Sequence, residues 1–255
     1  PATDAQPYFW RSVRWTELPR LFQTLGRQGL IFVDWALLML VVTLAVAAVL
    51  AFVLILLPLG RLPSHQKPFS RIRVWGYFTA LGLGFLLFEM AIFQRSNLFF
   101  GHPVIAASVI FAVFLIGSGL GSLTVAVAPS RRNLVIIFGG IGGGAALAFF
   151  VLWFGAGILW TLPLAAQFFV IALVSLPLSF ALGRPLPWGL RQLESREVLI
   201  PWAWGINGFA SVLAGPLASL LSIQFGQPLT WLAAAACYLV AWLIGWTWLG
   251  NKMPS

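Results

Sequence analysis

Long runs of apolar residues, interrupted by short groups of polar residues, glycine and proline, fill most of the chain after residue 33. A helix needs about 20 mostly apolar residues to cross the hydrocarbon core of a bilayer, and seven runs reach that length. Their apolar character is nearly continuous, which excludes the alternating pattern of a membrane β-barrel. Backbone groups in hydrocarbon must bond within their own segment, so the runs are predicted to be helices. The predicted spans are residues 34–57, 74–98, 104–127, 133–154, 158–182, 203–225 and 228–249.

The first 33 residues have a different pattern, in which aromatic residues alternate with arginines. An apolar stripe at helical spacing is formed by Leu18, Leu21, Phe22 and Leu25. We expect residues 1–33 to be an interfacial amphipathic segment lying on the membrane, or else a linker packed on the spans. We also expect it to lead from a missing upstream domain. The predicted fold is therefore all-α, a polytopic helical bundle of residues 34–255 with an N-terminal interfacial segment.

Composition agrees with this class, because 60% of the 255 residues are hydrophobic and only 8% are charged. A soluble domain carries roughly 25% charged residues, so an ordinary soluble enzyme is excluded. The net charge of +9 does not indicate nucleic acid as a partner, since the charges stand singly between apolar runs. Ten of the fifteen Lys and Arg fall on one side of the seven spans, which predicts that this side faces the cytoplasm and the N-terminus lies outside. A re-entrant span would place the N-terminus inside instead.

Two predicted turns have similar sequences. Phe100-Gly101-His102-Pro103 joins the second and third spans, and Phe225-Gly226-Gln227-Pro228 joins the sixth and seventh. Glycine suits the end of a helix and proline suits the first turn of the next one. The similarity indicates either an internal repeat of helical hairpins or convergence on a common tight turn.

Few polar side chains are predicted at membrane depth, and they form the candidate site. They are Glu89, Gln94, Arg95 and Asn207. A carboxylate inside a span is costly unless it is neutralised or paired. Glu89 is therefore a proton or cation site, or an anchor bonded to another helix. Arg95 points elsewhere on the helix, so we expect the partner of Glu89 to be on a different helix. A bond from Asn207 to Glu89 or Gln94 is the specific hypothesis.

Small residues at four-residue spacing predict close helix packing. The pairs are Gly117 with Gly121 and Gly139 with Gly143. No strand precedes either run, so a nucleotide-binding loop is not favoured. His102 is a candidate for an axial ligand to a haem or chlorin. The single cysteine, Cys237, is interpreted as a packing residue. We predict no metal site and no cofactor, while a bound lipid or pigment is compatible with the bundle.

Several stretches together resemble the membrane part of bacterial spermidine-synthase-like membrane proteins, in which an aminopropyltransferase-like domain is fused to transmembrane helices. The stretches are Gly82–Phe85 through Glu89 to Arg95, Gly101–Pro103, Gly117–Ser122, Ile200–Gly208 and the start Thr3–Phe9. In that start, Ala5 and Gln6 replace the acid and the arginine of the family's segment. The resemblance implies the membrane-embedded C-terminal portion of such a protein, in the bacterial cytoplasmic membrane, and supplies no catalytic motif to this chain.

Three functions remain in view. The first is a non-catalytic membrane domain that anchors or docks a soluble spermidine-synthase-like domain or partner proteins. The second is an accessory subunit of a large energy-transducing membrane complex. The third is half of a transporter for a polyamine or another cation, which predicts a hydrated cavity at Glu89, Gln94 and Asn207. The expected partners are membrane lipids and other membrane proteins or a soluble domain.

Overall fold

The computed structural model describes residue 23 and residues 35–60, 68–125, 130–193 and 198–250. Within these ranges the regular elements are helices, and there is no strand. Seven described helices are long and apolar enough to cross a membrane. The all-α helical membrane bundle predicted from the sequence is therefore confirmed. Apart from residue 23, the predicted interfacial segment 1–33 lies outside the described residues.

The elements follow one another with short connections. In chain order they are α2 (Trp35–Ala51), η3 (Phe52–Leu56), α3 (Leu57–Gly60), α4 (Pro68–Phe100), α5 (Pro103–Leu123), α6 (Arg131–Phe154), α7 (Ala156–Leu159), α8 (Leu164–Leu182), α9 (Pro185–Arg191), α10 (Ile200–Phe225) and α11 (Gln227–Gly250).

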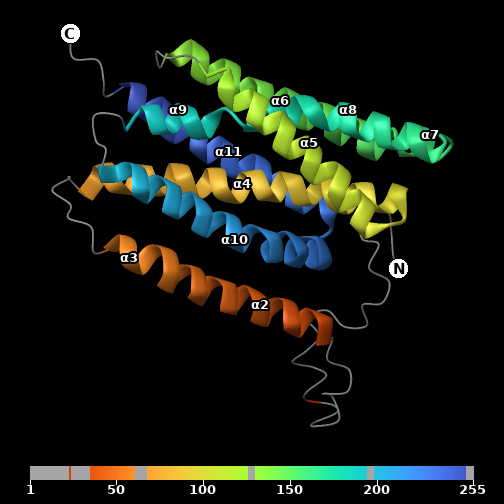
Figure 1. The fold of residues 1–255 in the computed structure, drawn as a ribbon, viewed down its shortest axis with the longest axis horizontal. Helices are drawn as coiled ribbons and strands as arrows, with labels where there is room; N and C mark the ends of the chain where they lie inside the picture. The colour runs from red at the N-terminus through yellow and green to blue at the C-terminus, as the bar shows by residue number, and fades with distance from the viewer. Residues whose placement is uncertain (1–22, 24–34, 61–67, 126–129, 194–197, 251–255) are drawn as a thin grey trace.

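Helix α4 occupies the centre of the bundle (Figure 1). Its 33 residues reach about 50 Å, longer than the roughly 30 Å hydrocarbon core of a bilayer. It packs against α10 and α11 and also contacts α5, α8 and α9. On one side, α8 lies between α5 and α6, and on the other side α2 packs on α10. Consequently α2 is the outermost helix, with only 6% of its most apolar window buried.

At two prolines, the helices end or begin at residues other than the predicted ones. The first span was expected to end before Pro58, but the helix continues through Pro58 to Gly60 by way of the π-helical turn η3. The wider hydrogen-bond spacing of a π-turn fits a residue without an N–H group. The fifth span was expected from residue 158, but α7 ends at Leu159 and α8 starts only after Pro163. Proline favours an extended residue before it and the first turn of a helix after it, so it separates the two helices.

The two similar turns also share backbone geometry. Gly101 and Gly226 are the described residues with positive φ, at 66° and 95°. Each follows the last turn of a helix and precedes a helix that has proline in its first turn. Both turns lie at the same end of the bundle (Figure 1). The predicted role of glycine is therefore confirmed, whereas common descent of the two hairpins stays a prediction.

Glycines bring α5 and α6 into direct contact with α8. A Cβ on Gly117 would collide with Ser179, and one on Gly121 would collide with the carbonyl oxygen of Phe180. Gly144 likewise lies against the backbone of Leu178. The close packing predicted for Gly117 and Gly121 is confirmed.

Gly139 and Gly143, in contrast, pack against no other helix among the described residues. Both are exposed, and a Cβ on either would meet no atom within 4 Å. The face of α6 that meets α8 instead carries Gly144, because the buried positions of α6 follow Ile137, Ile141 and Gly144. The glycine run is long enough to offer several registers, and spacing alone did not identify the one used.

These contacts predict opposite effects for two identical substitutions. Gly121→Ala should destabilise the protein by about 1–3 kcal/mol, because the new methyl group forces α5 away from the α8 backbone. Gly143→Ala should raise stability by about 0.5–1 kcal/mol, because alanine favours the helix and nothing obstructs it. Thermal unfolding in detergent, followed by size-exclusion chromatography, measures both. Equal melting temperatures for the two variants would contradict the packing described for α5.

Candidate functional site

A chain of hydrogen bonds joins α4, α10 and α11 inside the bundle. The Ser222 hydroxyl donates to Oε1 of Gln94, and the hydroxyls of Ser222 and Thr230 lie 2.8 Å apart. Ser222 and Thr230 are fully buried. Polar groups inside a membrane bundle bond across helices because lipid offers them no partner. Gln94 therefore holds the two hairpins together at the end where their turns lie.

Arg95 connects α4 to the last turns of α6. Its side chain is 3% exposed, and its Nε donates to the carbonyl oxygen of Leu152 at 3.0 Å. The guanidinium lies over the ring of Trp153 at 4.7 Å and near that of Phe99 at 5.7 Å. A cation is favoured at the C-terminal end of a helix and over aromatic faces. These contacts explain how a charged group can be buried at this depth.

Glu89 is 9% exposed and forms no hydrogen bond or ion pair with the described residues. Arg95 lies elsewhere on α4, as expected, with Leu152 as its partner. The bond from Glu89 to another helix that the sequence suggested is therefore not found in the described part of the chain. Whether Glu89 binds a proton or a cation stays a prediction.

The specific hypothesis that Asn207 bonds to Glu89 or Gln94 is wrong. The oxygen of Gln94 accepts from Ser222 instead. The backbone of Asn207 lies against Gly82, where a Cβ would collide with the Asn207 carbonyl oxygen. Gly82 is two helical turns before Glu89, so the register of α4 on α10 keeps Asn207 at a different depth from both predicted partners.

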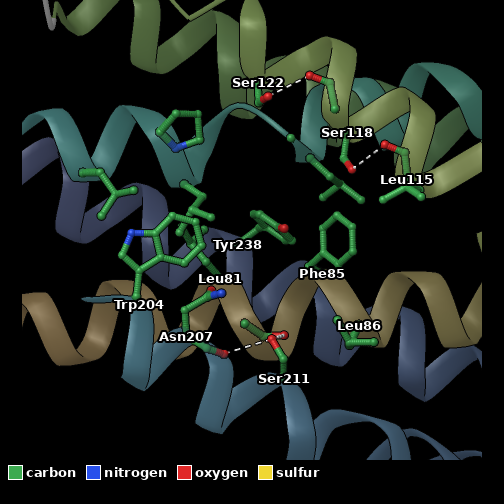
Figure 2. Close-up of a pocket in the computed structure, with 17 residues that line it drawn as sticks. Leu81, Phe85, Leu86, Leu115, Ser118, Ser122, Trp204, Asn207, Ser211 and Tyr238 are labelled. Carbon is green, nitrogen blue, oxygen red and sulfur yellow. Dashed lines mark hydrogen bonds between the residues drawn. The ribbon is translucent and has the colours of Figure 1, made fainter. Parts of the chain in front are cut away.

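A cavity of about 670 Å³ lies beside Asn207, between α4, α5, α9, α10 and α11. Its walls are mostly apolar, with Leu81, Phe85 and Leu86 on α4 and Leu186 and Leu190 on α9. Figure 2 shows the Asn207 side-chain amide and the Tyr238 hydroxyl directed into this space. Of the four polar residues predicted at membrane depth, only Asn207 lines it.

Tyr238 is the cavity residue that sequence reasoning missed. It is 4% exposed, and its ring packs between Phe88 at 5.9 Å and Phe138 at 6.3 Å. Its hydroxyl makes no hydrogen bond to the described residues, although a buried tyrosine hydroxyl usually finds a partner. In the sequence it stands within an apolar run, where nothing distinguishes it from a packing residue.

A second hollow is a groove of about 330 Å³ between α6 and α11. Small residues floor it, namely Gly139, Gly142, Ala145 and Ala235. Larger apolar side chains, including Val135 and Trp242, form its sides. At the end of α6 nearest the groove, the Arg131 guanidinium lies over the ring of Trp246 at 5.0 Å. Two exposed glycines of α6, Gly139 and Gly142, thus line a depression on the surface of the bundle.

His102 lies at the start of α5 with an exposed side chain. In the described part of the chain, no group of three or more His, Cys, Asp or Glu side chains could hold a metal ion. The role of His102 as an axial ligand stays a prediction. Comparison of the chain with protein-family models, curated proteins and solved structures returned no match.

The Gln94 network predicts a specific difference between two serines of α10. Ser222→Ala should destabilise the protein by about 1 kcal/mol, because it leaves the buried Gln94 oxygen without its donor. Ser219→Ala should have little effect, because that hydroxyl bonds only its own helix, at the Gly215 carbonyl.

The measurement is thermal unfolding of both variants, alone and combined with Gln94→Ala. Ser222→Ala should lose most of its effect when Gln94 is already alanine. Additive effects of Gln94→Ala and Ser222→Ala would show that the two side chains do not stabilise each other.

Proposed function

We propose that this chain is a non-catalytic membrane domain that docks other proteins in the membrane. The observation that carries the proposal is the groove between α6 and α11, where Gly139 and Gly142 are exposed to the surroundings of the bundle. Glycine in the middle of a helix costs stability relative to alanine. It is favoured in membrane helices where a second backbone approaches closely. A transmembrane helix of a partner protein is the occupant that makes use of this floor.

The polar interior supports docking over transport. A cation carrier was expected to have Glu89, Gln94 and Asn207 around one hydrated cavity. In the structure Gln94 is bonded to Ser222, and neither Gln94 nor Glu89 lines the cavity beside Asn207. That cavity is lined by mostly apolar side chains, a few neutral polar ones and no charged one, so it offers a cation no counter-charge.

The partner docked in the groove in this proposal is a membrane-anchored companion protein, while a soluble spermidine-synthase-like domain is a partner that the chain anchors at the membrane without using the groove. The soluble domain rests on the resemblance of Gly82–Arg95 and Ile200–Gly208 to that family. An accessory subunit of a larger membrane complex would bind its partner at the same groove. This alternative differs from docking only because it requires a fixed ratio of partner to chain.

The groove predicts which substitutions remove the partner. Gly139→Leu and Gly142→Leu should each abolish co-purification of a membrane protein, because a leucine side chain fills the floor without meeting other atoms of the bundle. Gly157→Leu is the matched control, since Gly157 is equally open but lies in α7, outside the groove.

The experiment is mild-detergent purification of the full-length protein from native membranes, followed by quantitative mass spectrometry. Proteins lost in both groove variants and kept in the Gly157→Leu variant are the docked partners. An unchanged set of proteins in all the variants would contradict docking at this groove. If vesicles containing the protein take up a cation, and the Glu89→Gln variant does not, the protein is a transporter and the docking proposal is wrong.

A further inference from the structure

We propose that the cavity between α5 and α10 binds a neutral membrane lipid whose head group presents a carbonyl oxygen. This cavity is separate from the α6–α11 groove, although Tyr238 lines both, and its occupancy by a lipid does not rest on docking.

The cavity is accessible from the surface that faces lipid. Both α5 and α10 pack on α4, and the cavity lies between them. Its lining includes Leu115 and Trp204, which are 75% and 54% exposed. Gly119 is also exposed and lines it, so no side chain blocks α5 at this point. A molecule in the bilayer can therefore enter sideways, with its tail left among the lipids.

The charge of the lining selects a neutral ligand. No Asp, Glu, Lys, Arg or His lines the cavity. A charged head group would lose its hydration in this apolar space without gaining a counter-ion. The volume of about 670 Å³ lies within the range of roughly 300–1,000 Å³ that is usual for small-molecule sites.

The hydrogen-bonding groups select an acceptor. The three serines of the lining already donate to backbone carbonyls of their own helices: Ser118 to Leu115, Ser122 to Gly119, and Ser211 to Asn207. Three side-chain donors of the lining then remain without a partner among the described residues: the half-exposed indole N–H of Trp204, and the more buried Tyr238 hydroxyl and Asn207 amide.

Figure 2 shows the Tyr238 hydroxyl, from α11, and the Asn207 amide, from α10, both bordering this cavity. A carbonyl oxygen has two lone pairs and can accept from both donors. Membranes supply such a group on an apolar body in two forms, the ring carbonyl of a quinone and the ester carbonyl of an acylglycerol. Quinones and acylglycerols share an uncharged carbonyl group that accepts hydrogen bonds.

The test is binding to the purified full-length protein in detergent, measured by native mass spectrometry. The probes are ubiquinone-2, 1,2-dioctanoylglycerol and, as the anionic comparison, dioctanoylphosphatidylglycerol. One neutral probe should bind saturably with one molecule per chain, and the anionic lipid should bind at least tenfold more weakly. The neutral probe that binds identifies the source of the carbonyl.

Two variants and one control locate the site. Tyr238→Phe keeps the ring packing and removes only the hydroxyl, so it should weaken binding about fivefold. Gly119→Leu should abolish binding by filling the cavity, since a Cβ there meets no atom within 4 Å and the fold is kept. Gly143→Leu is equally open and lies outside the cavity, so it should bind as the unmodified protein does.

The proposal is overturned if neither neutral probe binds saturably. It is also overturned if the anionic lipid binds as tightly as the neutral probe that binds best. It is equally overturned if Gly119→Leu and Tyr238→Phe both bind with unchanged affinity.

Discussion

Lipid cannot hydrogen-bond a polar side chain, and this constraint accounts for the way in which the bundle is held together. Gln94 bonds to Ser222, and Arg95 bonds to the carbonyl of Leu152 while its charge lies over Trp153. Since no water drives apolar faces together at this depth, contact between helices depends on small residues. Gly82 and Gly84 on α4 provide it toward α10 and α11. Helix α4 supplies both kinds of contact, and it is the helix around which the others are arranged.

Surfaces that are not used in helix packing can bind other molecules. The bonds of Gln94 and Arg95 join helices to each other. Two of the hollows in the described bundle are the cavity lined by the unpartnered donors of Tyr238 and Asn207 and the groove between α6 and α11 that Gly139 and Gly142 line. Both are lined mainly by apolar side chains and open toward lipid. The proposed docking and the proposed lipid binding each use one of these two hollows.

Sequence reasoning could predict what depends on local pattern. The apolar runs predicted the class and the seven long apolar helices, although α4 begins earlier than expected, at Pro68, and Pro58 and Pro163 change two other helix ends. It could not predict register between helices. Gln94 faces Ser222, Asn207 faces Gly82, and α6 uses Gly144 in place of Gly139 or Gly143. Tyr238 was not predicted as a site residue, because the cavity that it lines forms only when the helices pack in their actual register.

Helix α4 is the buried centre of the bundle, with α11 directly against it, and the single cysteine, Cys237, allows a direct measurement. A Cβ on Gly84 would lie 3.1 Å from the Cβ of Cys237, shorter than the roughly 3.5–4.5 Å of a disulfide, and would also press on the Tyr238 ring. A small separation of α4 from α11 relieves that contact and brings the two Cβ atoms into disulfide range. Gly84→Cys should therefore form a disulfide with Cys237 when native membranes are oxidised and the protein is examined by mass spectrometry. Gly76→Cys, whose Cβ would contact Ile244 two turns further along α11, should not. A reduced Cys237 in the first variant, or a disulfide in the second, would contradict the arrangement of α4 and α11.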